Sequence, residues 1–325
     1  MKRCIRDFTP ADYDALCAVH NRVFPDFLED AANLARQDEL REERHKHRRW
    51  VWEEGGKLLA FAEYTQSNWG YHPRKFFVEV AVEPDARRRG IGTALYDHVV
   101  TAVAEHDPIM LRGMVREDWE ASLAFARARG YADGIRMEES GCDIAAFRPA
   151  DHAAALARAE EQGIRIRSFP ELEDDPARDR KLYTLVQQLL ADMPRTEPHQ
   201  KPPFELWQRR SLESPRFLPE LNLVALDGDD YVGMSNFWRD LRPGHIGTGL
   251  TGVLASHRRR GLATALKVRA LSAARAAGFK VTTTWNAAEN AGMLGINRRL
   301  GFTARPAWME LELTLAAEEG ESVGA

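Results

Sequence analysis

The chain has 325 residues, of which 44% are hydrophobic and 29% are charged, and its net charge is −4. This balance is typical of a globular protein rather than a disordered one, and the length exceeds that of one ordinary domain, so we expect two domains. The mild acidity argues against a protein that mainly coats nucleic acid, because such proteins usually contain a strongly basic domain.

In chain order, the first half begins with a short strand and a helix, followed by two strands that an EEGGK turn joins as a hairpin. A third strand then leads through an arginine-rich turn into a long helix, a buried strand and a helix that ends at Gly130, where a left-handed cap is expected. We expect these elements at residues 4–8, 11–24, 48–54, 57–66, 75–82, 93–106, 108–115 and up to 130.

The second half has the same order of elements after an alanine-rich connecting helix at residues 151–163. We expect its elements at residues 164–169, 177–193, 221–228, 230–240, 248–255, 264–278, 279–285 and up to 301. Each half thus combines an antiparallel hairpin with a strand–turn–helix–strand unit. The patterns predict the α+β class, with two tandem domains in which helices flank a central mixed, mostly antiparallel sheet.

An internal repeat supports this division. The stretch RRRGIGTAL at residues 87–95 resembles RRRGLATAL at 258–266, and the same separation relates Gly130-Tyr131 to Gly301-Phe302. We therefore predict a first domain at 1–148, a connecting helix at 149–163, a second domain at 164–318 and a disordered tail at 319–325.

The three cysteines, Cys4, Cys17 and Cys142, are scattered and odd in number. They indicate neither a disulfide framework nor a metal site, so we expect no metal and a reducing cytoplasm as the location. The N-terminus lacks the apolar core of a signal peptide, and no apolar run approaches the roughly 18 residues of a membrane span. We expect no membrane partner and no nucleic-acid partner.

The arginine turns have the chemistry of an anion site. A glycine lets the chain turn sharply, a small residue two positions later keeps the helix start free of bulk, and the helix N-terminus presents unpaired N–H groups. Arginines add attraction for phosphate. The expected ligand is a diphosphate, although neither a Walker loop nor a three-glycine dinucleotide fingerprint is present.

In these motifs the chain resembles the Gcn5-related N-acetyltransferases (GNAT), whose acetyl-CoA signature [QR]-x-x-G-x-[GA] follows a strand. The signature occurs as RRRGIG at 87–92 and RRRGLA at 258–263. The resemblance covers nearly the whole chain. In architecture the chain is similar to the tandem, mycothiol-synthase-like members of the family. It implies two GNAT-like domains and an acetyl-CoA-dependent enzyme, monomeric or homodimeric, that transfers an acetyl group to a primary amine of a small molecule by direct attack.

The resemblance also implies where acetyl-CoA binds. The strand before each turn would separate from its neighbour and pair with the pantetheine arm through Val80, Ala81 and Val82 in the first copy and Thr251, Gly252 and Val253 in the second. The pyrophosphate would rest on the amides of Arg88–Thr93 and Arg259–Thr264. These amides belong to the turns formed by Arg87, Arg88, Arg89, Gly90, Ile91, Gly92 and Thr93 and by Arg258, Arg259, Arg260, Gly261, Leu262, Ala263 and Thr264.

Three asparagines in the second copy are candidates for catalysis or cofactor contact. Asn290 and Asn297 are seven residues apart, which predicts one helix face, and Asn286 precedes them. The resemblance implies a cofactor contact for Asn286 and Asn290, and it places Asn297 where many relatives have an acidic tyrosine. Helix capping and turn formation are the alternative. The first copy has Val115, Trp119 and Ala126 at these places.

Glu79 is the candidate general base of the first copy, one residue before an expected β-bulge, although it could equally be an exposed strand residue. Leu250 occupies the matching position in the second copy. The candidate bases there are less defined: Asn236, Asp240, His245, Glu289 or a chain of water molecules. Because Trp119 would obstruct the cofactor arm in the first copy, we expect catalysis in the second.

Other functions remain open from the sequence. A non-catalytic acyl-CoA sensor would explain why neither copy has the family's tyrosine, and nucleic-acid binding through the arginine turns is disfavoured by the net charge. His45 and His47 lie in a charge-dense stretch that favours a solvated helix end over a metal site.

Overall fold

The computed structural model describes residues 3–66, 70–193 and 197–316. The chain forms two compact units. Unit 1 comprises Met1–Met137, Thr196–Gln200 and Pro306–Ala325, and unit 2 comprises Glu138–Arg195 and Lys201–Arg305. The expected tail at residues 319–325 lies outside the described residues.

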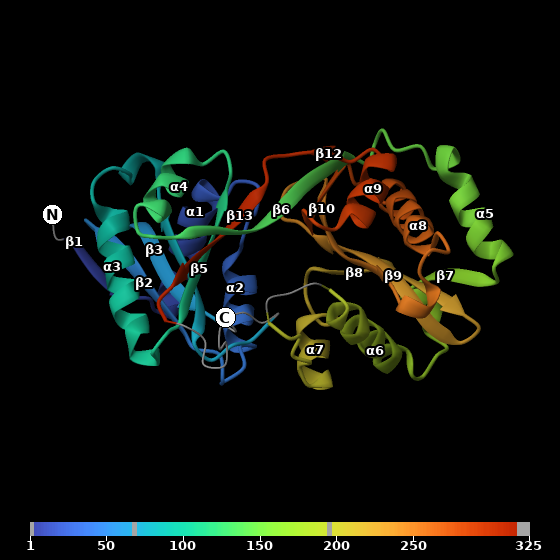
Figure 1. The fold of residues 1–325 in the computed structure, drawn as a ribbon, viewed down its shortest axis with the longest axis horizontal. Helices are drawn as coiled ribbons and strands as arrows, with labels where there is room; N and C mark the ends of the chain where they lie inside the picture. Colours follow the sequence, from blue (N-terminus) through green and yellow to red (C-terminus); the bar gives the residue numbers. More distant parts are fainter. Residues whose placement is uncertain (1–2, 67–69, 194–196, 317–325) are drawn as a thin grey trace, which may run out of the picture. The chain divides into compact units, whose positions relative to one another are not determined.

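Unit 1 alternates strands and helices much as the sequence predicts (Figure 1). Its helices are α1 (Tyr13–Val23), α2 (Ala31–Glu39), α3 (Ile91–Val103) and α4 (Glu120–Arg127). Its strands are β1 (Arg3–Asp7), β2 (His47–Glu54), β3 (Lys57–Thr65), β4 (Lys75–Val82), β5 (Met110–Arg116), the first part of β6 (Ala132–Asp143) and β13 (Trp308–Thr314).

The strands of unit 1 follow the order β1-β2-β3-β4-β5-β13-β6. Only β4 and β5 are parallel; the other neighbouring strands are antiparallel. One face packs on α3 through Leu95, Val99 and Val103, and the other packs on α1 through Leu16 and Val19. The side chains of each strand alternate between these two cores.

Unit 2 repeats this architecture. Its helices are α5 (Ala153–Glu161), α6 (Arg178–Ala191), α7 (Phe204–Arg210), α8 (Leu262–Ala276) and α9 (Ala291–Arg299). Its strands are the second part of β6 and β7 (Ile164–Ser168), β8 (Phe217–Asp227), β9 (Asp230–Arg239), β10 (His245–Val253), β11 (Val281–Ala287) and β12 (Thr303–Ala304).

The strands of unit 2 follow the order β6-β11-β10-β9-β8-β7, and β12 pairs with β6. One face of the sheet packs on α5 and α8, and the other on α6 and α7 (Figure 1). Helix α5 lies where the sequence predicts a connecting helix, and the α+β class with two flanked mixed sheets is confirmed.

The two compact units do not follow the linear ranges 1–148 and 164–318. Strand β13, from the end of the chain, lies between β5 and β6 in unit 1, where the red strand is seen between green ones in Figure 1. In turn, residues of β6 belong to the sheet of unit 2. Sequence reasoning did not predict β6 or β13, so the linear ranges stay a prediction of where the two repeats lie in the sequence.

Candidate functional site

The strand before the first arginine turn separates from its parallel neighbour. β4 pairs with β5 only at Lys75–Phe77, whereas it pairs with β3 as far as Val82. Among the described residues, 78–82 thus have a strand on one side only. Val80, Ala81 and Val82, the expected contacts of the pantetheine arm, lie in this free segment. The separation that the resemblance implies is therefore present in unit 1.

Unit 2 has the same separation together with a bulge. β10 pairs with β11 only at His245–Gly247, and its register with β9 shifts between Thr248 and Thr251. The Leu250 amide in the bulge donates to Asn236 Oδ1 at 2.7 Å. A Cβ on Gly249 would lie 2.4 Å from that oxygen, so the bulge requires glycine there.

The first copy has no such bulge. The register between β3 and β4 runs unbroken from Ala60↔Val82 to Thr65↔Phe77. The β-bulge expected beside Glu79 is therefore wrong for unit 1. An unbroken register places Glu79 directly opposite Glu63 on β3, and this pairing sets the chemistry of the Glu79 side chain.

The two arginine turns have the same backbone conformation. Gly90 and Gly261 have φ values of 82° and 83° and directly precede α3 and α8. Arg88 and Arg259 each have a φ of 62°, which is uncommon for a residue with a side chain. A Cβ on Gly90 would meet nothing within 4 Å, so the preference for glycine there arises from the backbone and not from lack of space.

This conformation leaves main-chain N–H groups without acceptors. Within the described ranges, the amides of residues 88–93 in unit 1 and 259–263 in unit 2 donate no hydrogen bond. Such groups at the positive end of a helix dipole attract anions. The Thr264 amide, expected to belong to the second turn, instead donates to the Gly261 carbonyl at 3.1 Å.

Some arginines of the turns have structural partners. The Nε groups of Arg87 and Arg258 donate to the carbonyls of Val82 and Val253 at 3.1 and 3.2 Å, so each arginine ties its turn to the preceding strand. Arg89 pairs with Glu54, and Arg260 exchanges two hydrogen bonds with Gln162 after α5. In the part of the chain that the structure describes, the side chains of Arg88 and Arg259 make no hydrogen bond or ion pair, and both are exposed.

Of the three candidate asparagines of unit 2, two are hydrogen-bonded to each other and the third caps a helix. Asn290 precedes α9, and its side chain accepts from the Met293 amide at 3.1 Å, as the capping alternative expects. Asn297 is 1% exposed and donates through Nδ2 to Asn286 Oδ1 at 2.8 Å. The expectation that Asn290 and Asn297 share a helix face is wrong, because Asn290 lies before the helix. Among the described residues, Asn297 Oδ1 is buried without a hydrogen-bond partner.

Glu79 is the one carboxyl group on β4, β5, β10 and β11, the strands that separate and that the structure describes throughout. It is partly buried on the sheet face that packs on α1, the face it shares with Ala81. Burial and the adjacent charge of Glu63 raise the pKa of Glu79 to about 8. A carboxyl group with a near-neutral pKa is suited to take a proton from an amine near neutral pH.

The candidate bases of unit 2 have different surroundings. Asn236 accepts from the bulge amide and cannot titrate. Burial alone would raise the pKa of Asp240, but hydrogen bonds from Arg242 outweigh it and lower that pKa. His245 Nδ1 lies 3.0 Å from the Pro243 carbonyl oxygen, and Glu289 is exposed.

Trp119, expected to obstruct the cofactor arm, lies directly before α4 in an aromatic cluster. Its ring centroid is 5.6 Å from that of Phe24 and 5.4 Å from that of Trp308 on β13. Arg116 lies over the same indole at 5.1 Å. The cluster fixes the start of α4, and the obstruction itself stays a prediction.

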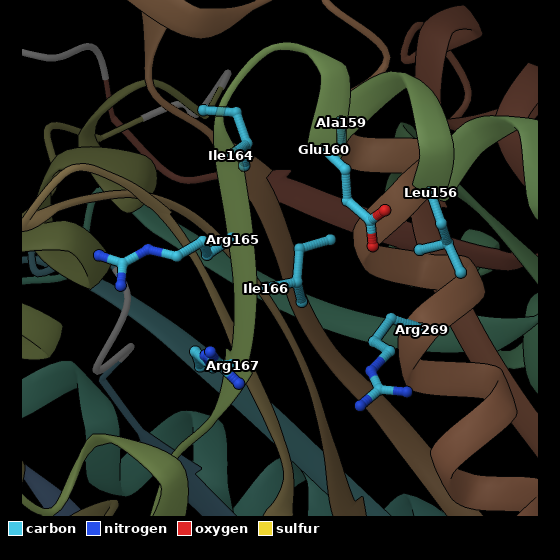
Figure 2. Close-up of a pocket in the computed structure, with 8 residues that line it drawn as sticks. All are labelled: Leu156, Ala159, Glu160, Ile164, Arg165, Ile166, Arg167 and Arg269. Carbon is cyan, nitrogen blue, oxygen red and sulfur yellow. The ribbon is translucent and has the colours of Figure 1, made fainter.

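Unit 2 also has a pocket of about 340 Å³ between α5, β7 and α8. Figure 2 shows Ile166 pointing from β7 toward the side on which Leu156, Glu160 and Arg269 lie, whereas Arg165 points the opposite way. The lining residues are Leu156, Ala159, Glu160, Ile164, Arg165, Ile166, Arg167 and Arg269. The residues singled out from the sequence do not line this pocket.

The sequence model of the acetyltransferase (GNAT) family matches residues 13–131 and, a second time, residues 182–302. Together the two segments span more than half of the chain, and each contains a separated strand and an arginine turn. The chain belongs to the GNAT family. Its tandem GNAT architecture, predicted from the repeat, is confirmed.

Solved structures with the same fold cover nearly the whole chain. A GCN5-related N-acetyltransferase from Sphaerobacter thermophilus matches with a TM-score of 0.68 and 19% identity, over 97% of this chain and 96% of that one. A tandem GNAT protein from the clavulanic acid biosynthesis pathway matches with a TM-score of 0.71 and 16% identity, over 98% of this chain and 100% of that one. At these identities the likeness concerns the fold.

A peptidyl-lysine N-acetyltransferase of Escherichia coli is 35% identical over 82 residues, which are 25% of this chain and 48% of that protein. The chain thus spans about half the length of this curated relative.

The described residues contain no group of three or more His, Cys, Asp or Glu side chains that could hold a metal ion. No helix in the described ranges has both the length and the apolar character that crossing a membrane requires.

Proposed function

We propose that this GNAT protein is an acetyl-CoA-dependent N-acetyltransferase that acetylates the primary amine of a small molecule, with Glu79 of unit 1 as the general base. The observation that carries the proposal is the position of Glu79. It lies on the free segment of β4, a few residues before a turn whose amides have no acceptor, and it has a raised pKa.

The two turns supply the proposed cofactor site. The unpaired amides of residues 88–93 and 259–263 would bind the pyrophosphate of acetyl-CoA, and the exposed Arg88 and Arg259 would add charge. The free main chain of β4 and β10 would pair with the pantetheine arm. The thioester would then lie near the separated ends of the parallel strands.

The reaction balances without a metal or a redox partner. The amine nitrogen attacks the thioester carbonyl, so that an N–C bond forms and the C–S bond breaks. Coenzyme A leaves as a thiolate, which takes a proton from the solvent, and the proton lost by the amine goes to Glu79. Held in place, the two reactants gain from proximity, and the base contributes a further rate factor.

Substitution of Glu79 tests the proposal. With a panel of amines and acetyl-CoA, release of free coenzyme A thiol by E79Q should fall by about 100-fold or more, because the amide cannot accept the proton. The affinity for coenzyme A should stay unchanged. Full activity in E79Q would refute Glu79 as the base, and thiol release with none of the amines would favour the acyl-CoA sensor.

A second candidate for the catalytic half remains unit 2, as the sequence predicts. The observation that favours it is Asn297, whose buried Oδ1 has no partner among the described residues and which lies beside Asn286. In that case unit 1 would bind acetyl-CoA without turnover. Variants that disable one turn at a time, described in the Discussion, separate the two candidates.

A further inference from the structure

A row of charged side chains crosses three strands of unit 1. Arg49 on β2 is paired in register with Glu63 on β3, and Glu63 is paired with Glu79 on β4. Residues directly opposite each other on adjacent antiparallel strands have their Cβ atoms about 4.5–5.5 Å apart. The row lies on the sheet face that packs on α1, so Glu63 has a cation on one side and a second carboxyl group on the other.

The contacts of Glu63 keep it ionised. Its Oε2 accepts from Arg49 Nε at 2.6 Å and lies 3.1 Å from His47 Nε2. Burial alone would raise the pKa of Glu63, but the hydrogen bond from His47 and the charge of Arg49 lower it to about 2. Glu63 is therefore a carboxylate at every pH at which the enzyme would work.

Arg49 is itself held rigidly. Its side chain is 4% exposed, and its Nη1 donates to Asp38 Oδ2 on α2 at 2.9 Å. Asp38 also accepts from Tyr13 on α1 and from Arg41. The positive charge of Arg49 is thus shared between two carboxylates, which leaves the negative charge of Glu63 only partly compensated where Glu79 lies.

We propose that Glu63 is a positioning residue for the proposed acetyl transfer: fixed as a carboxylate by Arg49 and His47, it makes the opposing Glu79 a stronger base. The inference rests on the proposed role of Glu79. Of the charged and titratable groups on the surrounding elements, Glu63 and Arg49 act on Glu79 directly, and the like charge of Glu63 prevails. Other charged or titratable groups on this side of the unit include Tyr13, Cys17, His20 and Arg22 on α1, Asp38, Arg41 and His47, Glu83 after β4, and Arg112, Glu310 and Glu312 on β5 and β13.

Unit 2 provides an internal contrast. The backbone contacts Phe8 N to Arg49 O and Phe169 N to Asn222 O are equivalent, so Asn222 occupies the place of Arg49. Asn222 is paired in register with Asn236, which therefore occupies the place of Glu63. Both charges of the row are replaced by amides in the unit whose matching strand has no carboxyl group. The charged row and the candidate base are thus both present in unit 1 and both absent from unit 2.

The direct test is the titration of Glu79 in the full chain with carboxyl-labelled glutamate, followed by NMR. The Glu79 resonance is assigned by its absence in E79Q. In the parent protein it should titrate with a pKa of about 8, and in E63Q its midpoint should move toward acid by about one unit or more, since the like charge is gone. E63D, which keeps the charge, should retain the parent midpoint.

D38N is the matched control, because it removes the other carboxylate on Arg49 without touching the strand opposite Glu79. It should move the Glu79 midpoint less than E63Q does. A Glu79 midpoint near its ordinary value of 4.5 in the parent protein, or the same midpoint in E63Q and the parent, would overturn the inference. A parent midpoint near 4.5 would overturn the inference even where E63Q does not fold.

The pH profile links this titration to catalysis. The rising limb of kcat/KM should follow the Glu79 midpoint in the parent and shift toward acid in E63Q, a change that a merely structural role would not produce. If the NMR midpoint shifts but E79Q keeps full activity, the proposed base is wrong while the coupling stands. If E79Q is inactive but E63Q leaves the midpoint unmoved, the proposed function stands and this inference fails.

Discussion

Lys267 is a lysine whose side chain is buried in unit 2. It lies in the middle of α8, is 3% exposed, and has its Nζ 4.9 Å from the ring centroid of Phe302. Burial lowers its pKa from 10.5 to about 8. The charged form is therefore disfavoured in the folded protein, and the position should tolerate an apolar side chain of similar length.

We predict that K267M stabilises unit 2 by about 1–3 kcal/mol at neutral pH, since a desolvated charge is removed. Between pH 8 and 10.5 the unfolded state binds the lysine proton more strongly than the folded state does. The free energy of unfolding of the parent should therefore rise with pH across this window and that of K267M should not. Denaturant unfolding at a series of pH values measures this, with the exposed Arg269→Met as a control on the same helix.

At the residue scale, the sequence predicted main-chain chemistry better than side-chain pairing. The role of the glycines in the turns could be predicted, because it depends only on their position directly before a helix. The role of Glu63 was missed, because a strand register decides which side chain lies opposite Glu79. A signal was present in the sequence: Glu63 is a charged residue inside the otherwise apolar run LLAFAEY of β3.

At the scale of elements, the arginine turn is the feature that this chain repeats with nearly the same φ values in both units. A glutamate at Gly90 would project a negative charge beside the unpaired amides and would strain a backbone with φ of 82°. The same holds for Gly261, whose added side chain would also meet Arg158 at 3.9 Å.

We predict that G90E abolishes thiol release from acetyl-CoA, whereas G261E leaves it largely intact, if Glu79 is the base. The opposite result would place catalysis in unit 2, and loss in both variants would mean that the units depend on each other. Matched controls for backbone strain are G56E and G228E, in the hairpin turns of each unit, where φ is +80° and +59° and the space is open. Both controls should remain active.

Element prediction succeeded where hydrophobic periodicity and turn residues agree, as for the β2–β3 hairpin and α8. It failed for the asparagines, because seven-residue spacing defines a helix face only if both residues lie inside the helix, and Asn290 precedes α9. The prediction of a bulge beside Glu79 was also wrong. A bulge forms at Gly249 in unit 2, where Asn236 Oδ1 accepts a hydrogen bond from the bulge amide, and the register beside Glu79 in unit 1 is unbroken.

At the scale of the whole molecule, the last strand of the chain completes the first unit. β13 pairs with β5 from Trp308↔Arg116 to Thr314↔Met110 and with β6 on its other edge. Leu311 is 1% exposed and belongs to the core under α3. No local pattern could predict this, since strand partners distant in sequence are chosen by the packing of the finished unit.

We predict that a chain truncated after Arg305 loses the cooperative unfolding of unit 1, because the edges of β5 and β6 and their apolar side chains become exposed. A chain truncated after Ala316 retains β13 and should unfold like the parent. Thermal unfolding followed by circular dichroism compares the two. Identical transitions in both truncated chains would show that β13 is dispensable.

The central claim is that main-chain amides at the two helix starts bind the phosphates of coenzyme A. Isothermal titration calorimetry of the full chain with coenzyme A tests it most directly. The account predicts saturable binding by the parent and by the control variants G56E and G228E, and none by the double variant with Gly90→Glu and Gly261→Glu. No binding to the parent, or unchanged binding to the double variant, would contradict it.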